Sequence, residues 1–279
     1  MNMTNIKLIV TDLDGTLLTN EKTVSEKDRL LLEKAQQKGV ITAIATGRNL
    51  YKTNQVVSRE MPFDYAIVSS GAGVFNWEQK DYESIRLLDK QRVDMLCSWL
   101  MKRDHSFFLF DQLPNNHLML FHRSRVFNSD FEAYMEANEQ HAQEMTVENR
   151  YESATQLMVS IPENEEEFAL IKKSLEEEIE GVQVIRSTSQ LDDRFIWIEI
   201  FAHAVSKGEG IDFLCKKYNI QPDEVIGVGN DYNDIEMLDY AGHAYITSNA
   251  PDLLKRNGYK LTASNEESGV AQAILNHIG

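Results

Sequence analysis

The sequence predicts an α/β protein with a core and an inserted second domain. In residues 1–83 and again in residues 201–279, short apolar runs alternate with amphipathic segments, the pattern of parallel strands joined by helices. Between them, residues 84–200 change to helices and strands that include a hairpin signal, which is typical of antiparallel α+β structure. We therefore expect a Rossmann-like core with a mostly parallel sheet, interrupted by an α+β cap domain.

Local signals support each element of the first core segment. Ser25 followed by Asp28 resembles a capping box, which begins a helix, and Gly39 suits the end of that helix. The elements expected before the insert are, in order, a strand at 6–10, the helix from Ser25 to about Gly39, a strand at 40–45, a helix up to Met61-Pro62 and a strand at 66–68.

The insert and the last core segment are interpreted in the same way. Pro114-Asn115-Asn116 separates two apolar runs and predicts a hairpin, and residues 165–180 predict an acidic helix with a solvated face. Strands are expected in the insert at 107–110, 118–121, 157–161, 182–185 and 195–200. After the insert we expect a helix from 206, a strand at 225–228, a helix through Leu238, a strand at 244–246, a helix from Asn249, a strand at 259–261 and a helix from about Gly269.

Composition limits the class of protein and its partners. The 279 residues, 42% hydrophobic and 26% charged, are ordinary for a globular chain with a sizeable core. The formal net charge of −16 argues against nucleic acid and anionic membrane as partners, because both require a basic surface. The two cysteines, Cys97 and Cys215, suggest no disulfide framework. Residues 1–5 show no basic segment and no long apolar run, so we expect a cytoplasmic protein.

The most informative stretch is Asp12-Leu13-Asp14-Gly15-Thr16, which follows the first expected strand. Gly15 allows the chain to turn sharply there. Two carboxylates so close raise each other's pKa unless a cation lies between them, and Mg²⁺ suits an all-oxygen site. The stretch predicts a metal site with a carboxylate that acts as a nucleophile, although by itself it also fits an ordinary turn.

Four polar clusters follow strands or begin helices: Asp12 with Asp14, Thr46, Lys207, and the run from Asn230 to Asp234. A parallel sheet would gather them along one edge, and their types suit phosphoryl transfer. Asp12 would attack phosphorus, and Asp14 would protonate the leaving oxygen and then deprotonate the attacking water. The Thr46 hydroxyl, neighbouring backbone N–H groups such as that of Gly47, and the Lys207 ammonium would bind phosphate oxygens. Each cluster alone also has a simpler explanation as a turn, cap or solvated charge.

Together these segments resemble the four motifs of the haloacid dehalogenase (HAD) superfamily, and the insert resembles the large C2-type α/β cap of Cof-type phosphatases. The matching segments are Asp12-x-Asp14-Gly15-Thr16-Leu17, Thr46-Gly47-Arg48, Ser206-Lys207-Gly208 and Gly229-x-x-x-Asn233-Asp234. The resemblance implies a Mg²⁺-dependent phosphatase that hydrolyses small phosphorylated metabolites, often sugar phosphates, through an aspartyl-phosphate on Asp12.

The resemblance also assigns residue roles. Asp14 would be the acid and base, Thr46, Gly47 and Lys207 would bind the substrate phosphate, and Arg48 is a candidate substrate contact. Asp12, the Asp14 backbone carbonyl and the last motif would hold Mg²⁺. In that motif Asn230 stands where the superfamily usually has Asp. We expect Asn230 and Asp234 to be metal ligands, with Asp231 as the alternative ligand. Because an amide is uncharged, we also expect a higher Mg²⁺ requirement.

Three further expectations stay open at this point. Ser70 replaces the Asn that commonly precedes Gly-Ala after the third strand, which bears on contacts at the cap side of the site. Candidate cap contacts to substrate are Arg123, Arg125, Arg186 and Arg194, each more simply a surface charge. Alternative functions are a phosphomutase that uses the same aspartyl-phosphate and a phospho-acceptor signalling module without turnover. No feature of the sequence selects an oligomeric state.

Overall fold

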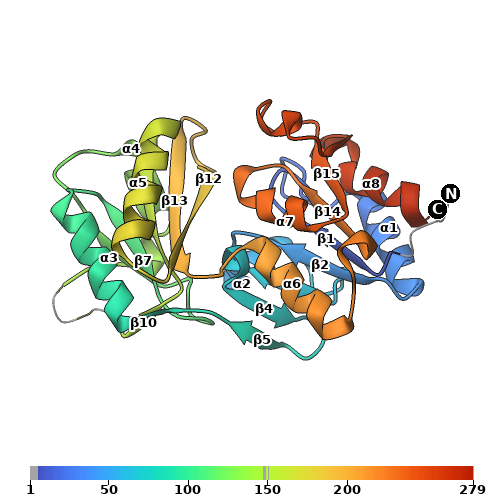
Figure 1. Ribbon diagram of the computed structural model, residues 1–279, viewed down its shortest axis with the longest axis horizontal. Helices are drawn as coiled ribbons and strands as arrows, with labels where there is room; N and C mark the ends of the chain where they lie inside the picture. Colours follow the sequence, from blue (N-terminus) through green and yellow to red (C-terminus); the bar gives the residue numbers. More distant parts are fainter. Residues whose placement is uncertain (1–5, 147–148, 150, 279) are drawn as a thin grey trace. The chain divides into compact units, whose positions relative to one another are not determined.

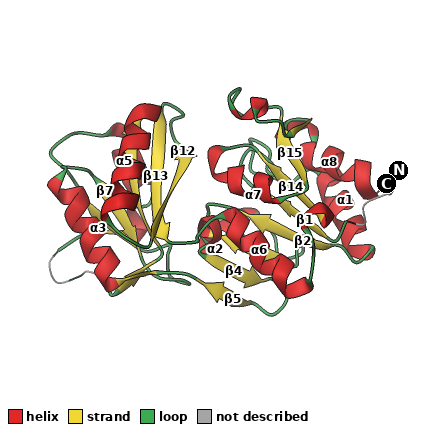
Figure 2. Ribbon diagram, viewed as in Figure 1, coloured by secondary structure: helices red, strands yellow, loops and turns green. Residues whose placement is uncertain are grey.

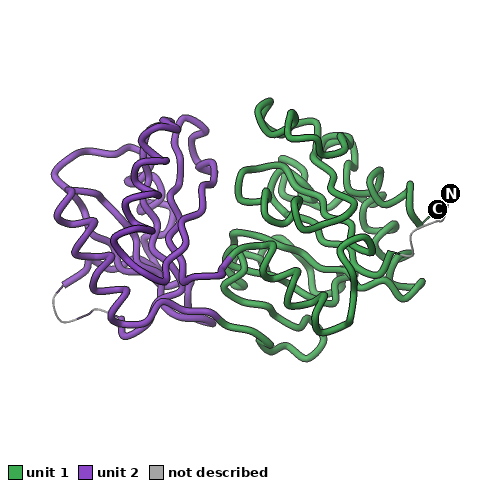
Figure 3. The backbone as a smooth tube through the Cα atoms, viewed as in Figure 1, with its two compact units in different colours: residues 1–85, 206–279 green, residues 86–205 purple. Residues whose placement is uncertain are grey.

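The chain forms two compact units, Met1–Ile85 with Ser206–Gly279, and Arg86–Val205 (Figure 3). This computed structural model describes residues 6–146, 149 and 151–278; residues 1–5, on which the expected lack of a targeting segment rests, lie outside them. In the described part, no helix has the length and apolar character needed to cross a membrane. The second unit begins at Arg86, two residues after the expected start of the insert, and ends at Val205, five residues after its expected end. The expected bounds of the insert stay a prediction.

The first unit is built on one eight-stranded sheet with the order β16-β15-β14-β1-β2-β3-β4-β5 (Figure 1). Its strands are β1 Leu8–Thr11, β2 Ile41–Ala45, β3 Tyr65–Val68, β4 Gly73–Asn76, β5 Asp81–Ile85, β14 Val225–Gly229, β15 His243–Thr247 and β16 Lys260–Thr262. Neighbours from β16 to β3 pair in parallel, and β4 and β5 continue the sheet in antiparallel pairing. The expected parallel-rich α/β core is therefore confirmed.

Helices pack on both faces of this sheet (Figure 2). They are α1 Glu26–Gln37, α2 Leu50–Val56, α6 Lys207–Tyr218, α7 Ile235–Tyr240 and α8 Gly269–Ile278. Ile9 of β1 belongs to the hydrophobic cluster with α1 and α8, whereas Leu8 and Val10 belong to the cluster with α6 and α7. Because alternate residues of a strand face opposite sides, this double burial explains the nearly continuous apolar run of the first strand.

Three local expectations for the first unit are wrong. The antiparallel strands β4 and β5 were not expected, since the residues of β5 are half-buried or exposed and lack a clear hydrophobic pattern. Helix α2 ends at Val56, because Val57 is already extended, and does not reach Met61-Pro62. The helix expected from Asn249 is only a 3₁₀ turn at Leu254–Arg256. The Asn249 side chain instead contacts the Gly15 oxygen and the Asn265 N–H, so it caps no helix.

The second unit contains a six-stranded sheet with the order β12-β13-β11-β7-β8-β9 and a small pair, β10-β6. Its strands are β6 Leu88–Asp89, β7 Phe107–Phe110, β8 Met119–His122, β9 Ala142–Glu144, β10 Ser153–Ala154, β11 Gln156–Pro162, β12 Val182–Thr188 and β13 Phe195–Ala202. The expected β7–β8 hairpin is present, and all pairs except β8–β9 are antiparallel.

Helices lie on both faces of this second sheet. They are α3 Lys90–Lys102, α4 Ser129–Ala137 and α5 Glu165–Glu178. One hydrophobic cluster joins α3 and α5 to the sheet, and another, with Phe131 and Tyr134 of α4, joins α4 to residues such as Phe108. The first-turn glutamates of α5 are exposed, as expected for its acidic face. The unit therefore has a hydrophobic core of its own.

The turn after β3 passes close to the start of α6 in the first unit. Ser69 and Ser70 have positive φ angles of 50° and 54°, and Gly71 has a φ of 106°. A Cβ atom on Gly71 would lie 2.1 Å from the backbone oxygen of Ser206, the N-cap residue of α6. Glycine is therefore required at this position by both its φ angle and the close approach of another backbone.

Replacing Gly71 with alanine should destabilise the protein more than the same change at Gly39. Gly39 also has a positive φ, 79°, but a Cβ there has no neighbour within 4 Å. The Gly39→Ala change therefore measures backbone strain alone, and Gly71→Ala adds a clash with backbone. We expect Gly71→Ala to cost at least about 1 kcal/mol more in the free energy of unfolding, measured by urea denaturation. Equal losses in the two variants would contradict this close approach.

Candidate active site

Lys207 joins three segments at the carboxyl edge of the parallel sheet. Its Nζ lies 2.7 Å from Asp12 Oδ1, 2.6 Å from Asp234 Oδ1 and 3.3 Å from Asn233 Oδ1. The Lys207 and Asp234 side chains are 1% and 0% exposed. Asp12 directly follows β1 and the Asn233-Asp234 pair follows β14, and these two strands are parallel neighbours. The structure thus brings the first, third and fourth sequence motifs together.

Asp234 also fixes the loop that follows β14. Its Oδ2 accepts hydrogen bonds from the backbone N–H groups of Asn230 (2.8 Å) and Asp231 (3.0 Å). The Asp231 side chain in turn caps the 3₁₀ turn Tyr232–Asp234. Both oxygens of Asp234 are therefore engaged, so it contacts a metal directly only by giving up one of these partners. The expected metal roles of Asp234 and Asp231 stay predictions.

The buried Asp12–Lys207 pair has unusual titration behaviour. Burial raises the pKa of Asp12 and the nearby Asp234 adds to this rise, while Lys207 opposes it, which leaves the pKa at about 7. Burial acts to lower the pKa of Lys207, but the two carboxylates outweigh it and raise that pKa well above its usual range. The ammonium therefore stays charged, and the two carboxylates around it favour a further cation.

Asp14 has its own cationic partners. Arg48 donates from Nε to Asp14 Oδ2 (2.6 Å) and from Nη2 to Oδ1 (2.7 Å), and Lys22 donates to Oδ1 (2.8 Å). Burial acts to raise the pKa of Asp14, but these charged hydrogen bonds outweigh it and lower the pKa to about 2. The pKa of Asp14 is therefore lowered and not raised, and the rise at Asp12 comes mainly from burial, with only a minor contribution from the nearby Asp14.

The turn after β2 lies against two other loops. Thr46 is 1% exposed, and its Oγ1 accepts a hydrogen bond from the Arg48 N–H (3.1 Å). A Cβ atom on Gly47 would lie 3.6 Å from both Asn233 Nδ2 and Ser70 Oγ. The second motif therefore lies between the loops after β3 and β14.

The Asn230 side chain lies beside oxygens of the first motif. With its amide nitrogen turned toward them, it donates to the Asp14 backbone oxygen (3.0 Å), Thr16 Oγ1 (2.9 Å) and Asp12 Oδ2 (3.3 Å). In the reverse orientation, the Thr16 hydroxyl donates to the amide oxygen (2.9 Å), which then faces the oxygens of Asp12 and Asp14. One carboxylate, one carbonyl and one amide oxygen at these separations fit a hard cation such as Mg²⁺.

This donor set differs from a cluster of acidic or imidazole ligands. Within the described residues, no group of three or more His, Cys, Asp or Glu side chains is arranged to hold a metal ion. A Mg²⁺ site here would combine the Asp12 carboxylate with uncharged backbone and amide oxygens. The weaker metal binding expected from the Asn at position 230 stays a prediction.

Sequence reasoning missed two residues that contact the expected site. Lys22 reaches Asp14 from the loop before α1, and Asn233 contacts Lys207. Asn233 could have been found from its place in the fourth motif, whereas nothing in the sequence distinguishes Lys22 from other surface lysines. In the second unit, the candidate arginines Arg123 and Arg186 form ion pairs with Glu132 and Glu165.

The remaining two candidate arginines also have local partners. Arg194 forms an ion pair with Asp192, and the Arg125 backbone N–H contacts the Asp104 carboxylate. Three of the four candidate side chains thus pair with carboxylates of the same unit. Arg123 and Arg194 are 45% and 82% exposed, which supports their interpretation as surface charges, whereas Arg186 is only 7% exposed and is a buried charge.

Comparison with known proteins shows the family. A family model described as haloacid dehalogenase-like hydrolase matches residues 9–274. The chain belongs to the haloacid dehalogenase-like hydrolase family. Phosphatase YwpJ of Bacillus subtilis (strain 168) is 27% identical, over 98% of this chain and 100% of its own. The 5-amino-6-(5-phospho-D-ribitylamino)uracil phosphatase YwtE of the same organism is 24% identical, over 96% of this chain and 97% of its own.

A solved structure gives the same fold. The phosphatase BT1666 from Bacteroides thetaiotaomicron superposes with a TM-score of 0.79 at 23% identity, covering 100% of this chain and 97% of that one. The HAD resemblance drawn from the four motifs is confirmed, and the HAD-family chain is a phosphoric monoester hydrolase. This identification disfavours the signalling module considered from the sequence.

Replacing Lys207 with methionine should strongly destabilise the protein. Two buried carboxylates would then lose their cation, a change that typically costs about 3–5 kcal/mol. The pKa of Asp12, already raised by burial, would rise further without Lys207, so the loss should be largest at pH 8 and smaller at pH 5, where protonation relieves it. Unfolding free energies at both pH values measure this.

Lys216→Met is the matched control for Lys207→Met, because Lys216 lies on the same helix but is 78% exposed and pairs with Asp212. We expect its effect to stay within about 0.5 kcal/mol at both pH values. A similar loss in both variants, or a Lys207→Met deficit that does not change with pH, would show that the buried ion pairs are not as described.

Proposed function

We propose that this phosphatase hydrolyses small phosphorylated metabolites through a covalent phosphate on Asp12. The observation that carries the proposal is the buried contact of Lys207 with Asp12 and Asp234 at the carboxyl edge of the sheet. A fixed carboxylate beside a desolvated ammonium combines a nucleophile with positive charge for the phosphoryl oxygens. The neighbouring Thr46-Gly47 turn adds hydroxyl and N–H donors to this position.

The proposed reaction has two steps. In the first, an Asp12 oxygen bonds to phosphorus while the bond from phosphorus to the substrate's ester oxygen breaks, and Asp14 gives that oxygen a proton. In the second, Asp14 takes a proton from water as the water oxygen attacks phosphorus. The bond between phosphorus and Asp12 breaks, inorganic phosphate leaves, and the Asp12 carboxylate is restored. Lys207 holds phosphoryl oxygens in both steps.

Asp14 needs a change of partners before it acts as an acid. Its hydrogen bonds to Arg48 and Lys22 hold the pKa near 2, which keeps it a carboxylate. We propose that the anionic substrate draws these cations away, so that Asp14 gains a proton and reaches the leaving oxygen. Arg48 then acts as a substrate contact, the role expected for it from the sequence.

Mg²⁺ is the proposed cofactor. Asp12, the backbone oxygen of Asp14 and the Asn230 amide oxygen would hold it, with the amide in the orientation that points its oxygen at the ion. When bound, the ion would supply positive charge to the transferring phosphoryl group. The proposed assignment leaves Lys207, Thr46 and Gly47 free to bind phosphate oxygens that the metal does not hold.

The proposed substrates are phosphomonoesters of sugars or similar polyols. YwtE is named for 5-amino-6-(5-phospho-D-ribitylamino)uracil, in which the phosphate is carried by a sugar-alcohol chain. The compact unit Arg86–Val205 contributes none of the proposed catalytic residues, so we propose that it selects the leaving group. A panel of sugar, polyol and nucleotide phosphates tests this substrate class, and a preference outside sugars and polyols would contradict it.

The cytoplasmic location of the protein stays a prediction.

Asp12→Asn and Asp14→Asn should differ in their dependence on the leaving group. Asp12→Asn removes the nucleophile, so kcat should fall by at least about 100-fold for every ester. Asp14→Asn should reduce hydrolysis of an alkyl phosphate more than that of para-nitrophenyl phosphate, whose leaving group needs little protonation. Steady-state kinetics on both esters measure this, with circular dichroism to confirm folding. A folded Asp12→Asn enzyme that kept more than about a tenth of wild-type activity, only ~1.4 kcal/mol in barrier, would contradict the assignment.

Asn230→Asp should lower the Mg²⁺ concentration for half-activation by roughly tenfold. The new carboxylate would repel Asp12 without metal, so the unfolding midpoint should fall without Mg²⁺ and rise more when Mg²⁺ is added. Thermal unfolding with and without Mg²⁺ gives a readout separate from activity.

The comparison of Asn230→Ala with Asp231→Ala tests which residue is the ligand. If only Asp231→Ala raises the Mg²⁺ requirement, the fourth motif is shifted by one residue.

A further inference from the structure

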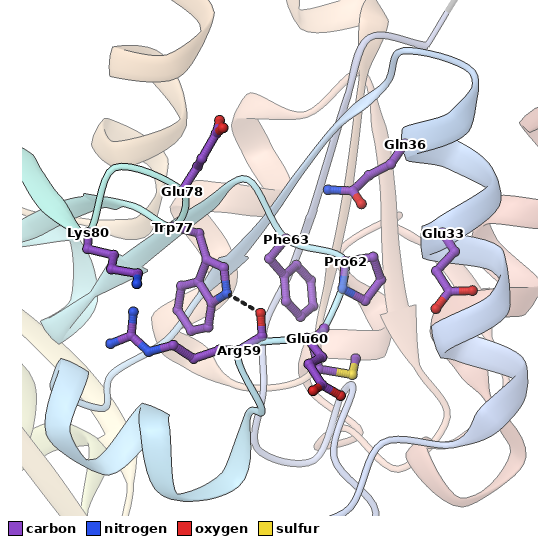
Figure 4. A pocket seen from close by; sticks show the side chains of 10 residues that line it. Glu33, Gln36, Arg59, Glu60, Pro62, Phe63, Trp77, Glu78 and Lys80 are labelled. Carbon is purple, nitrogen blue, oxygen red and sulfur yellow. Dashed lines mark hydrogen bonds between the residues drawn. The ribbon is translucent and has the colours of Figure 1, made fainter.

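A cavity lies at the edge of the parallel strands opposite Asp12, and Figure 4 shows the side chains that line it. It has a volume of about 500 Å³, which is in the range of small-molecule sites. The residues that line it are Glu33 and Gln36 of α1, residues 59–63 before β3, with Glu60 among them, and Trp77, Glu78 and Lys80 between β4 and β5. Residues 59–63 lead into β3, whereas Asp12 and Thr46 follow strand ends, so the two sites are at opposite edges of the parallel strands.

One wall of this cavity is apolar and firmly built. Phe63 and Trp77 are 4% and 7% exposed and belong to the main hydrophobic cluster of the first unit. The Trp77 indole N–H donates to the backbone oxygen of Arg59 (3.3 Å), which ties the ring to the loop before β3. Pro62 lies beside Phe63 in the same wall. The wall therefore offers a fixed apolar surface to a ligand.

Two cations lie at one end of the cavity. Figure 4 shows the ends of Arg59 and Lys80 pointing toward one another beside Trp77, and Arg59 Cζ is 5.9 Å from the centroid of the indole ring. Across the residues that the structure describes, no carboxylate forms an ion pair with either side chain. Glu33, on the α1 side of the cavity, is paired with Arg29. An anion between Arg59 and Lys80 would relieve the repulsion between two like charges.

We propose that this cavity binds a small amphipathic anion. Its carboxylate or phosphate group would lie between Arg59 and Lys80, and its apolar body would contact Pro62, Phe63 and Trp77. The site is separate from the phosphatase centre, and the proposal does not depend on the reaction proposed for Asp12. Both elements are needed, since two exposed cations alone bind anions weakly in water and the apolar wall alone selects no charge.

Equilibrium dialysis with 2-naphthoate tests the proposal, because this probe combines a carboxylate with an apolar ring system. Wild-type protein should bind 2-naphthoate at least about tenfold more tightly than the uncharged 2-naphthamide or than acetate, which lacks the rings. Arg59→Ala and Lys80→Ala should each weaken binding about tenfold, the effect expected for the loss of one charge-assisted contact. Turnover of para-nitrophenyl phosphate, unchanged in both variants, would show that the first unit is intact.

Lys34→Ala is the matched control, because Lys34 is exposed on α1 near this cavity but does not line it. It removes the same charge and should leave 2-naphthoate binding unchanged. The proposal is overturned if 2-naphthoate does not bind, if the amide binds as tightly, or if Lys34→Ala has the same effect as Lys80→Ala.

Discussion

The arrangement of this protein depends on one buried ammonium. Lys207 lies between Asp12 and Asp234, which are 195 and 27 positions away in the sequence. Removing three charges from water is costly, and the contacts recover this cost only while all partners stay in place. The group of two carboxylates and one ammonium still has a net negative charge. The same interaction therefore orders the loops that carry Asp12 and Asp234 and leaves a site that favours a further cation.

The rest of the first unit serves to hold that contact. Strand β1 is buried on both faces, so Asp12 emerges from a rigid position at the sheet edge. Asp234 links the loop after β14 to Lys207, and Gly71 lets the turn after β3 pass the N-cap of α6. Asp14 is the exception, since it is held by Arg48 and Lys22, and not by the buried group. The proposed nucleophile is thus fixed and the proposed acid is exchangeable, which agrees with the different tasks proposed for them.

The sequence predicted the parts of the fold that local patterns determine. The strands with continuous apolar runs, the capped helices and the β7–β8 hairpin were found because hydrophobic period and turn residues are local properties. Strands β4 and β5 were missed because the pairing of β4 with β3 and of β5 with β4 is a tertiary effect that local sequence patterns barely signal. The helix expected from Asn249 failed because that side chain is used in long-range contacts with Gly15 and Asn265.

For the candidate site, the sequence predicted which residues meet but not how they are paired. Motifs that follow parallel strands or begin helices were enough to predict that Asp12 and Lys207 meet, because parallel strands share one edge and the helices begin near it. The hydrogen bond from Lys22 to Asp14 could not be predicted, since it depends on the path of a loop whose sequence has no distinguishing pattern. The hydrogen bonds to both carboxylate oxygens of Asp234 also could not be predicted, because they depend on the course of the loop after β14.

Chemical trapping of the phosphorylated enzyme tests the central claim most directly. Wild-type protein is mixed with an excess of a good phosphomonoester substrate and Mg²⁺, quenched within the first turnover, and reduced with borohydride, which converts an aspartyl-phosphate to homoserine. Peptide mass spectrometry then locates the modified residue. The account predicts homoserine at position 12, formed only when substrate is present. Modification at another carboxylate, or turnover with no modified residue at any quench time, would contradict it.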